Sequence, residues 1–135
     1  MSESAILSAA RAVAAATFPT AKDWSDDPAN IKPESMPAFV VTVTRDGATQ
    51  EAMGSDLEEV QLTIEVEVFD AYETNQDGRE VIGAKGEAVR DALKADAALD
   101  ALLDRVTGST FEVDIASGRK RLARATVGLL AEATF

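Results

Sequence analysis

Hydrophobic and polar residues alternate strictly along residues 57–69. The apolar positions are Val60, Leu62, Ile64, Val66 and Val68, and the polar positions between them are Glu59, Gln61, Thr63, Glu65 and Glu67. A period of two places successive side chains on opposite faces of a strand. The pattern therefore predicts a long antiparallel strand with one buried and one solvated face.

Two amphipathic helices are predicted, over residues 3–17 and 80–95. Apolar residues recur at helical spacing in each segment, as Ile6, Ala10 and Val13 show in the first. Residues 96–106 are expected to continue the second helix by a further turn.

The remaining strands are predicted at residues 38–45, 110–116 and 121–134. Residues 19–37 contain all four prolines of the chain and are expected to form a loop. Asp46-Gly47 predicts a turn, with an irregular stretch to residue 56.

The expected element order is α-β-β-α-β-β, within one domain that spans residues 1–135. Two helices and four strands fit an α+β fold with two layers, in which both helices cover one face of a mainly antiparallel four-stranded sheet.

The charge balance narrows the possible functions. The chain has 24 acidic and 13 basic residues, a formal net charge of −11. A general nucleic-acid binder needs a basic surface that displaces counterions, so the charge disfavours that class. The chain contains no cysteine and no histidine, which removes disulfides, thiolate metal sites and the commonest general base. We expect a protein that is not an enzyme and that needs no cofactor.

The hydrophobic residues are rich in alanine, and aromatic residues make up 5% of the chain. Such a composition predicts a thin core, and a subunit with a thin core gains stability by assembling with copies of itself. Residues 1–16 carry Glu3 and Arg11 and lack the continuous apolar stretch of a signal peptide. No apolar run is long enough to span a membrane. Assembly is expected in a cytoplasm.

Two acidic stretches contain the residue types of a cation site. Residues 73–78 resemble the start of a calcium-binding loop, but the twelfth position, Ala84, lacks the bidentate glutamate that such a loop requires. Asp23, Asp26 and Asp27 cluster in the proline-containing loop and could chelate a hard cation. A polar turn and a solvated loop explain both stretches without a metal ion.

The segment Ile82-Gly83-Ala84-Lys85-Gly86 resembles the GXXG signature of KH domains, whose loop clamps a single-stranded nucleic-acid backbone. In that interpretation Lys85 contacts a phosphate. A KH domain places a helix before this loop, whereas a strand and a polar connection are predicted here. The other interpretation is that the glycines let the second helix approach a neighbouring element. A KH-like nucleic-acid-binding module remains an alternative.

Several segments together resemble a known family in their order and spacing. They are Ala5-Ile6-Leu7-Ser8-Ala9-Ala10-Arg11-Ala12-Val13, Met36-Pro37-Ala38-Phe39-Val40-Val41, the long strand at 60–68, Glu87-Ala88-Val89-Arg90-Asp91-Ala92-Leu93, Ala95-Asp96-Ala97-Ala98-Leu99 and Arg124-Ala125-Thr126-Val127-Gly128-Leu129-Leu130. The chain resembles the tail-terminator family of siphophages and gene-transfer-agent particles. The glycine-rich stretch at 83–86 and the acidic segment at 46–59 depart from the family pattern.

The resemblance implies a structural virion protein, assembled in the bacterial cytoplasm. Its subunits would form a hexameric ring on the head-proximal end of the phage tail, where the ring ends polymerisation of the tail tube. The expected partners are the major tail tube protein and a head-side connector or head-closure protein, with DNA passing through the lumen without specific binding. Another neck protein, such as a head-closure subunit, is an alternative.

Two sets of charged residues are candidates for sites in such a ring. The basic run Arg119, Lys120 and Arg121 is a solvated hairpin tip or the positive half of a contact between subunits. Its candidate partners on the next subunit are Asp56, Glu58 and Glu59. Glu65 and Glu67 share one strand face and are candidates for an acidic lumen or outer surface.

Overall fold

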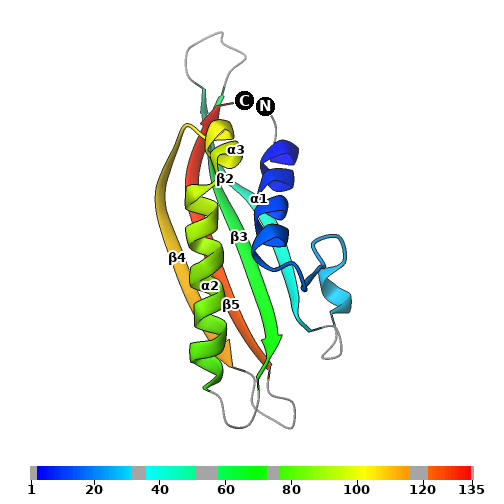
Figure 1. Ribbon diagram of the computed structural model, residues 1–135. Helices are drawn as coiled ribbons and strands as arrows, with labels where there is room; N and C mark the ends of the chain where they lie inside the picture. The colour runs from blue at the N-terminus through cyan, green and yellow to red at the C-terminus, as the bar shows by residue number, and fades with distance from the viewer. Residues whose placement is uncertain (1–2, 32–35, 51–57, 73–76, 116–121, 135) are drawn as a thin grey trace.

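The computed structural model describes residues 3–31, 36–50, 58–72, 77–115 and 122–134. The helices are α1 (Glu3–Thr17), α2 (Gly78–Ala95) and α3 (Ala97–Leu102), with a short 3-10 helix, η1 (Pro28–Asn30). The strands are β1 (Lys22–Asp23), β2 (Ala38–Gln50), β3 (Glu58–Ala71), β4 (Arg105–Ile115) and β5 (Leu122–Thr134). The fold is α+β, as the sequence predicts, with α1 and α2 lying side by side over one face of the sheet (Figure 1).

The sheet has five strands in the order β1-β2-β3-β5-β4. Strands β2 to β5 pair antiparallel, and β1 adds a short parallel pairing to the start of β2. The register aligns Val66 of β3 with Val41 of β2 and Val127 of β5, so these side chains share one face. All three are at most 3% exposed beneath the helices, which places the core between the two layers.

The long strand β3 carries the predicted face alternation. Leu62, Ile64 and Val66 are 1%, 0% and 0% exposed in the core. The polar residues between them lie on the side of the sheet without helices. A register slip of one residue would have inverted these faces, so the prediction is confirmed.

Each long helix buries the stripe that its spacing predicts. α1 buries Ile6, Ala10, Val13 and Ala14, as expected for 3–17. α2 begins at Gly78 because the Asp77 side chain accepts a hydrogen bond from the backbone N–H of Arg79 at 3.0 Å and caps the helix.

No helix in the described part of the chain combines the length and apolar character that a membrane crossing requires.

Two fold predictions are wrong in detail. The sheet has five strands and is mixed, not four-stranded and antiparallel, because β1 forms inside the loop at 19–37. With only two residues, β1 is too short to show a period of two. A separate third helix, α3, replaces the expected further turn of the second helix, because Asp96 ends α2 and caps α3 by accepting from Leu99 N at 2.9 Å. The observed order is therefore not α-β-β-α-β-β.

The strand boundaries also differ from prediction. β2 continues past residue 45 to Gln50, because Asp46 forms a β-bulge between the pairs Arg45–Leu62 and Gly47–Gln61 in place of a turn. β4 starts at Arg105, five residues before the predicted start at 110. Asp46-Gly47 favours a turn locally, but pairing with the long strand β3 on both sides keeps this part of the chain in a strand.

Candidate functional site: the acidic sheet face

The side of the sheet without helices carries mostly acidic charge. The register brings together Glu65 and Glu67 of β3 with residues of β4 and β5 on the same side. We define the acidic sheet face as the charged residues Glu59, Glu65, Glu67, Glu112, Asp114, Glu132, Arg105 and Arg124. Six of these eight described residues are acids and two are bases, so together they carry a net negative charge.

Arg124 links three strands at one end of this face. Its guanidinium lies 2.6 Å from the Asp114 carboxylate on β4 and 3.7 Å from the Glu67 carboxylate on β3. The pKa of Arg124 is raised mainly by the hydrogen bond to Asp114. Arg124 thus partly neutralises the acids at this end.

Glu67 is a partly buried acid of this group, with 27% of its side chain exposed. Burial raises the pKa of its carboxyl; Arg124 opposes the shift, and the neighbouring Glu65 adds to it. Partial burial therefore makes the charged form of Glu67 less favourable than it would be in water.

At the other end of the face, Arg105 binds Glu132 across β4 and β5. Its Nε and Nη2 donate to the two carboxylate oxygens at 3.0 and 2.9 Å. This pairing lowers the pKa of Glu132, while the hydrogen bond and charge of Glu132 raise the pKa of the nearby Glu59 carboxyl.

The predicted contact residues lie mostly outside the described residues. Arg119, Lys120, Arg121 and Asp56 are not among them, and only the backbone of Glu58 is described. The segment 116–121 joins β4 to β5 at one end of the sheet, where Ala71 pairs with Leu122. The segment 51–57 joins β2 to β3 at the other end, where Glu59 pairs with Thr134. Positions 59 and 71 are 12 residues apart, roughly 40 Å along an extended strand.

The structure brings Glu65 and Glu67 onto one face, as predicted. Glu112, Asp114 and Glu132 lie on the same side and are not among the predicted site residues. The spacing of Glu112 and Asp114 on β4 repeats that of Glu65 and Glu67 on β3, and it was the available signal.

The acidic loop residues bind an arginine. Arg11 of α1 donates to Asp23 at 2.7 Å and to Asp26 at 3.1 and 3.3 Å. Asp27 accepts from the side chain of Asn30. Among the described residues, no group of three or more acidic side chains is arranged to hold a metal ion. In the calcium-like stretch, Asp77 caps α2 and Gly78 begins it. Residues 73–76 lie outside the described residues.

The glycine stretch that resembles a KH loop lies within a continuous helix. Gly83 and Gly86 are interior positions of α2, so no loop is present to clamp a nucleic-acid backbone. Lys85 forms an ion pair with Asp70 at 2.7 Å. A Cβ added to Gly86 would lie 2.8 Å from the Phe111 ring and 2.9 Å from the Ala125 Cβ, whereas one added to Gly83 would have no atom within 4 Å. Close approach to a neighbour therefore explains Gly86 but not Gly83.

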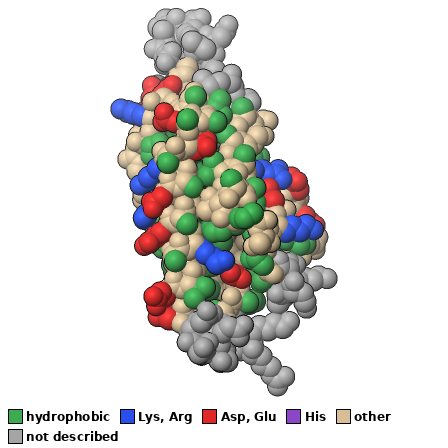
Figure 2. All heavy atoms as spheres, viewed as in Figure 1, with side chains coloured by type: hydrophobic (Ala, Val, Ile, Leu, Met, Phe, Trp, Pro, Cys, Tyr) green, Lys and Arg blue, Asp and Glu red, His purple; other side chains and the backbone are tan. Residues whose placement is uncertain are grey.

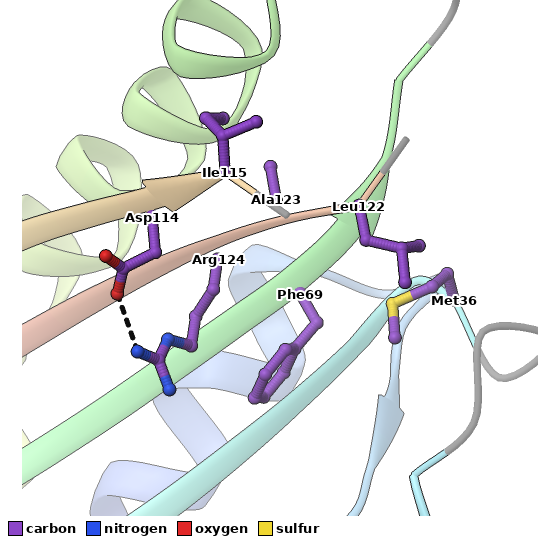
Figure 3. A pocket seen from close by; sticks show the side chains of 7 residues that line it. All are labelled: Met36, Phe69, Asp114, Ile115, Leu122, Ala123 and Arg124. Carbon is purple, nitrogen blue, oxygen red and sulfur yellow. Dashed lines mark hydrogen bonds and ion pairs between the residues drawn. The ribbon is translucent and has the colours of Figure 1, made fainter. Parts of the chain in front are cut away.

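A cavity of about 310 Å³ opens where β3 and β4 end and β5 begins (Figure 3). Phe69, Met36 and Leu122 form an apolar side, and Arg124 and Asp114 form a charged side. Ile115 and Ala123 complete the lining. The lining therefore combines an apolar surface with an ion pair.

The helix side of the molecule has a different character. Figure 2, which views it from that side, shows acidic, basic and hydrophobic side chains interspersed, without one large patch of a single charge. The acidic sheet face, with six acids and two bases, differs from this mixture. No protein-family model and no curated protein matches this chain.

Proposed function

We propose that this chain is a structural virion protein that forms a ring on the head-proximal end of a phage tail tube. The ring ends tube polymerisation and offers the surface on which head and tail join. It binds the major tail tube protein on one side and a head-side connector or head-closure protein on the other, and it acts without catalysis or cofactor. The resemblance in segment order and spacing suggests the family.

The observation that carries the proposal is the acidic sheet face. A ring that passes DNA needs a lumen that does not bind it. An acidic surface repels the DNA phosphates, whereas a basic surface would bind them and release counterions. In the proposed ring of six, Glu65 and Glu67 line the lumen and the helices face outward.

The KH-like alternative is disfavoured by a specific observation. Its phosphate-binding loop would be residues 83–86, and these are helical, with Gly86 packed against Phe111 and Ala125. The only basic residue of the motif, Lys85, is already paired with Asp70.

A capping assay tests the proposal with purified components. Tail tube protein is polymerised with and without this chain, and tube lengths are measured by electron microscopy. The proposal predicts shorter tubes, each with a ring of this chain at one end. Tubes of unchanged length without end rings would contradict terminator activity.

The lumen assignment has its own test. Glu65→Lys combined with Glu112→Lys should make rings retain double-stranded DNA at low salt, while Glu80→Lys combined with Glu87→Lys, two exposed acids of α2, should not. Equal retention by both double variants would argue that the acidic sheet face does not line the lumen.

A further inference from the structure

Strand β4 (Arg105–Ile115) forms one edge of the sheet. Among the described residues, its outer side has no strand partner. The strand contains no proline and no lysine, two residues that commonly protect such edges. A bulge between Val106 and Gly108 interrupts only its first part. The remainder is a regular edge whose backbone N–H and C=O groups can extend the sheet.

The same strand carries exposed apolar side chains. Val106 and Phe111, 41% and 38% exposed, are the large hydrophobic residues most open to solvent in the described part of the chain. The Phe111 ring lies against Gly86 and 5.6 Å from the Arg90 guanidinium. A half-exposed aromatic ring beside an open strand edge is typical of an interface.

The opposite edge of the sheet is only partly covered. β1 pairs with Ala38 and Phe39 of β2, and the Ser25 hydroxyl accepts a hydrogen bond from the backbone N–H of Val41. Thr42, Val43 and Thr44 lie beyond the reach of β1 and have a strand partner only on their β3 side within the described chain.

Strand directions make the two edges compatible. Each neighbouring pair from β2 through β3 and β5 to β4 is antiparallel, so β2 and β4 run in opposite directions. A second copy in the same orientation would therefore place its β2 antiparallel to β4. The side chains also agree, because Thr42 and Thr44 are uncharged and face the side that carries Thr110 and Glu112.

We propose that the β4 edge of one subunit pairs with the edge formed by Thr42–Thr44 of β2 in the next copy of the chain. Phe111 then packs on the same side as Val43 of the partner subunit. The contact joins two different patches, so it is head-to-tail and closes into a ring when the rotation fits. The inference rests on the proposed ring and names its lateral contact. It is an alternative to the ionic contact between 119–121 and 56–59, which would join opposite ends of the strands.

Disulfide trapping tests the contact directly, because the chain has no native cysteine. Two double variants are made, Thr110→Cys with Thr42→Cys and Thr110→Cys with Thr44→Cys. All three threonines are exposed on the helix-free side. Within one subunit, β2 and β4 are three strand spacings apart, roughly 14 Å, which is too far for a disulfide. Thr110→Cys with Ala84→Cys on α2 is the matched control.

The expected result is a ladder of covalent oligomers on oxidation of at least one of the two double variants, at least tenfold more abundant than in the control. Dimers from Thr110→Cys alone would overturn the inference, because they would show two β4 edges paired with each other. Rings in native mass spectrometry without a ladder in either double variant would overturn it while leaving the ring intact. Absence of both ring and ladder would also overturn it, and the terminator function would then be judged by the tube-capping assay alone.

Discussion

The packing of α2 against the sheet at Gly86 gives a sharp test of the structure. Gly86→Ala adds a methyl group that meets the Phe111 ring at 2.8 Å and the Ala125 Cβ at 2.9 Å. Gly83→Ala makes the same change one turn earlier in the same helix, where nothing lies within 4 Å. The two variants therefore share the change in helix propensity and differ only in packing.

The expected magnitudes separate the two variants. Replacing glycine by alanine in a helix interior adds about 1 kcal/mol to stability, so Gly83→Ala should raise the free energy of unfolding by about that amount. In Gly86→Ala the same gain is opposed by overpacking of about 1–3 kcal/mol. Phe111 is half-exposed and can move aside, but Ala125 is fully buried in β5 and cannot. The net result should be a loss of up to about 2 kcal/mol.

Urea unfolding followed by circular dichroism measures both changes. With a slope of roughly 2 kcal/mol per molar urea, the midpoints of the two variants should differ by roughly 1 M. Adding Ala125→Gly to Gly86→Ala should recover part of the loss, with a coupling energy of at least about 0.5 kcal/mol. Equal stabilisation by Gly83→Ala and Gly86→Ala would refute the packing described for α2.

Three further predictions concern charge. The pKa of Glu67 is raised, so the folded state binds the proton of this carboxyl more tightly than the unfolded state does. Glu67 therefore destabilises the folded state as the pH rises above the unfolded pKa. Glu67→Gln should raise the urea midpoint at pH 7 and not at pH 3, and an equal shift at both pH values would contradict the burial argument. Single-stranded RNA and DNA should not bind at physiological salt; micromolar binding that is lost in a folded Ala84→Asp, Lys85→Asp variant, measured by fluorescence anisotropy, would restore the KH interpretation. Charge reversal of Arg119, Lys120 and Arg121 should weaken the ring, more strongly at low salt, if the ionic contact holds it; native mass spectrometry showing an unchanged ring would favour the strand-edge contact instead.

The sequence was sufficient to predict an element of the fold where a long periodic pattern of apolar residues was present. The alternation along β3 identified the buried face, and the apolar spacing in α1 identified that helix, whose predicted range of 3–17 is confirmed. It was insufficient for β1, whose two residues pair with β2 only through the tertiary fold. Asp46-Gly47 was misassigned because local turn propensity cannot reveal that a partner strand continues on both sides.

The candidate site was only partly predictable for a related reason. Glu65 and Glu67 share a face by strand periodicity alone. Their neighbours Glu112 and Asp114 join them through β5, which lies between β3 and β4. Strand order in a sheet depends on pairings between residues distant in sequence, so Arg124 could not be recognised as the residue that links Glu67 and Asp114.

The central claim is that this chain stops tail-tube growth, and the most direct measurement is tail length in particles that lack it. The gene is deleted from the genome of the proposed particle, and the tails are measured by electron microscopy. The control supplies the intact gene in trans. The terminator proposal predicts tails of abnormal and variable length that fail to join heads, with normal tails restored by the control. Tails of normal, uniform length in the deletion would contradict it.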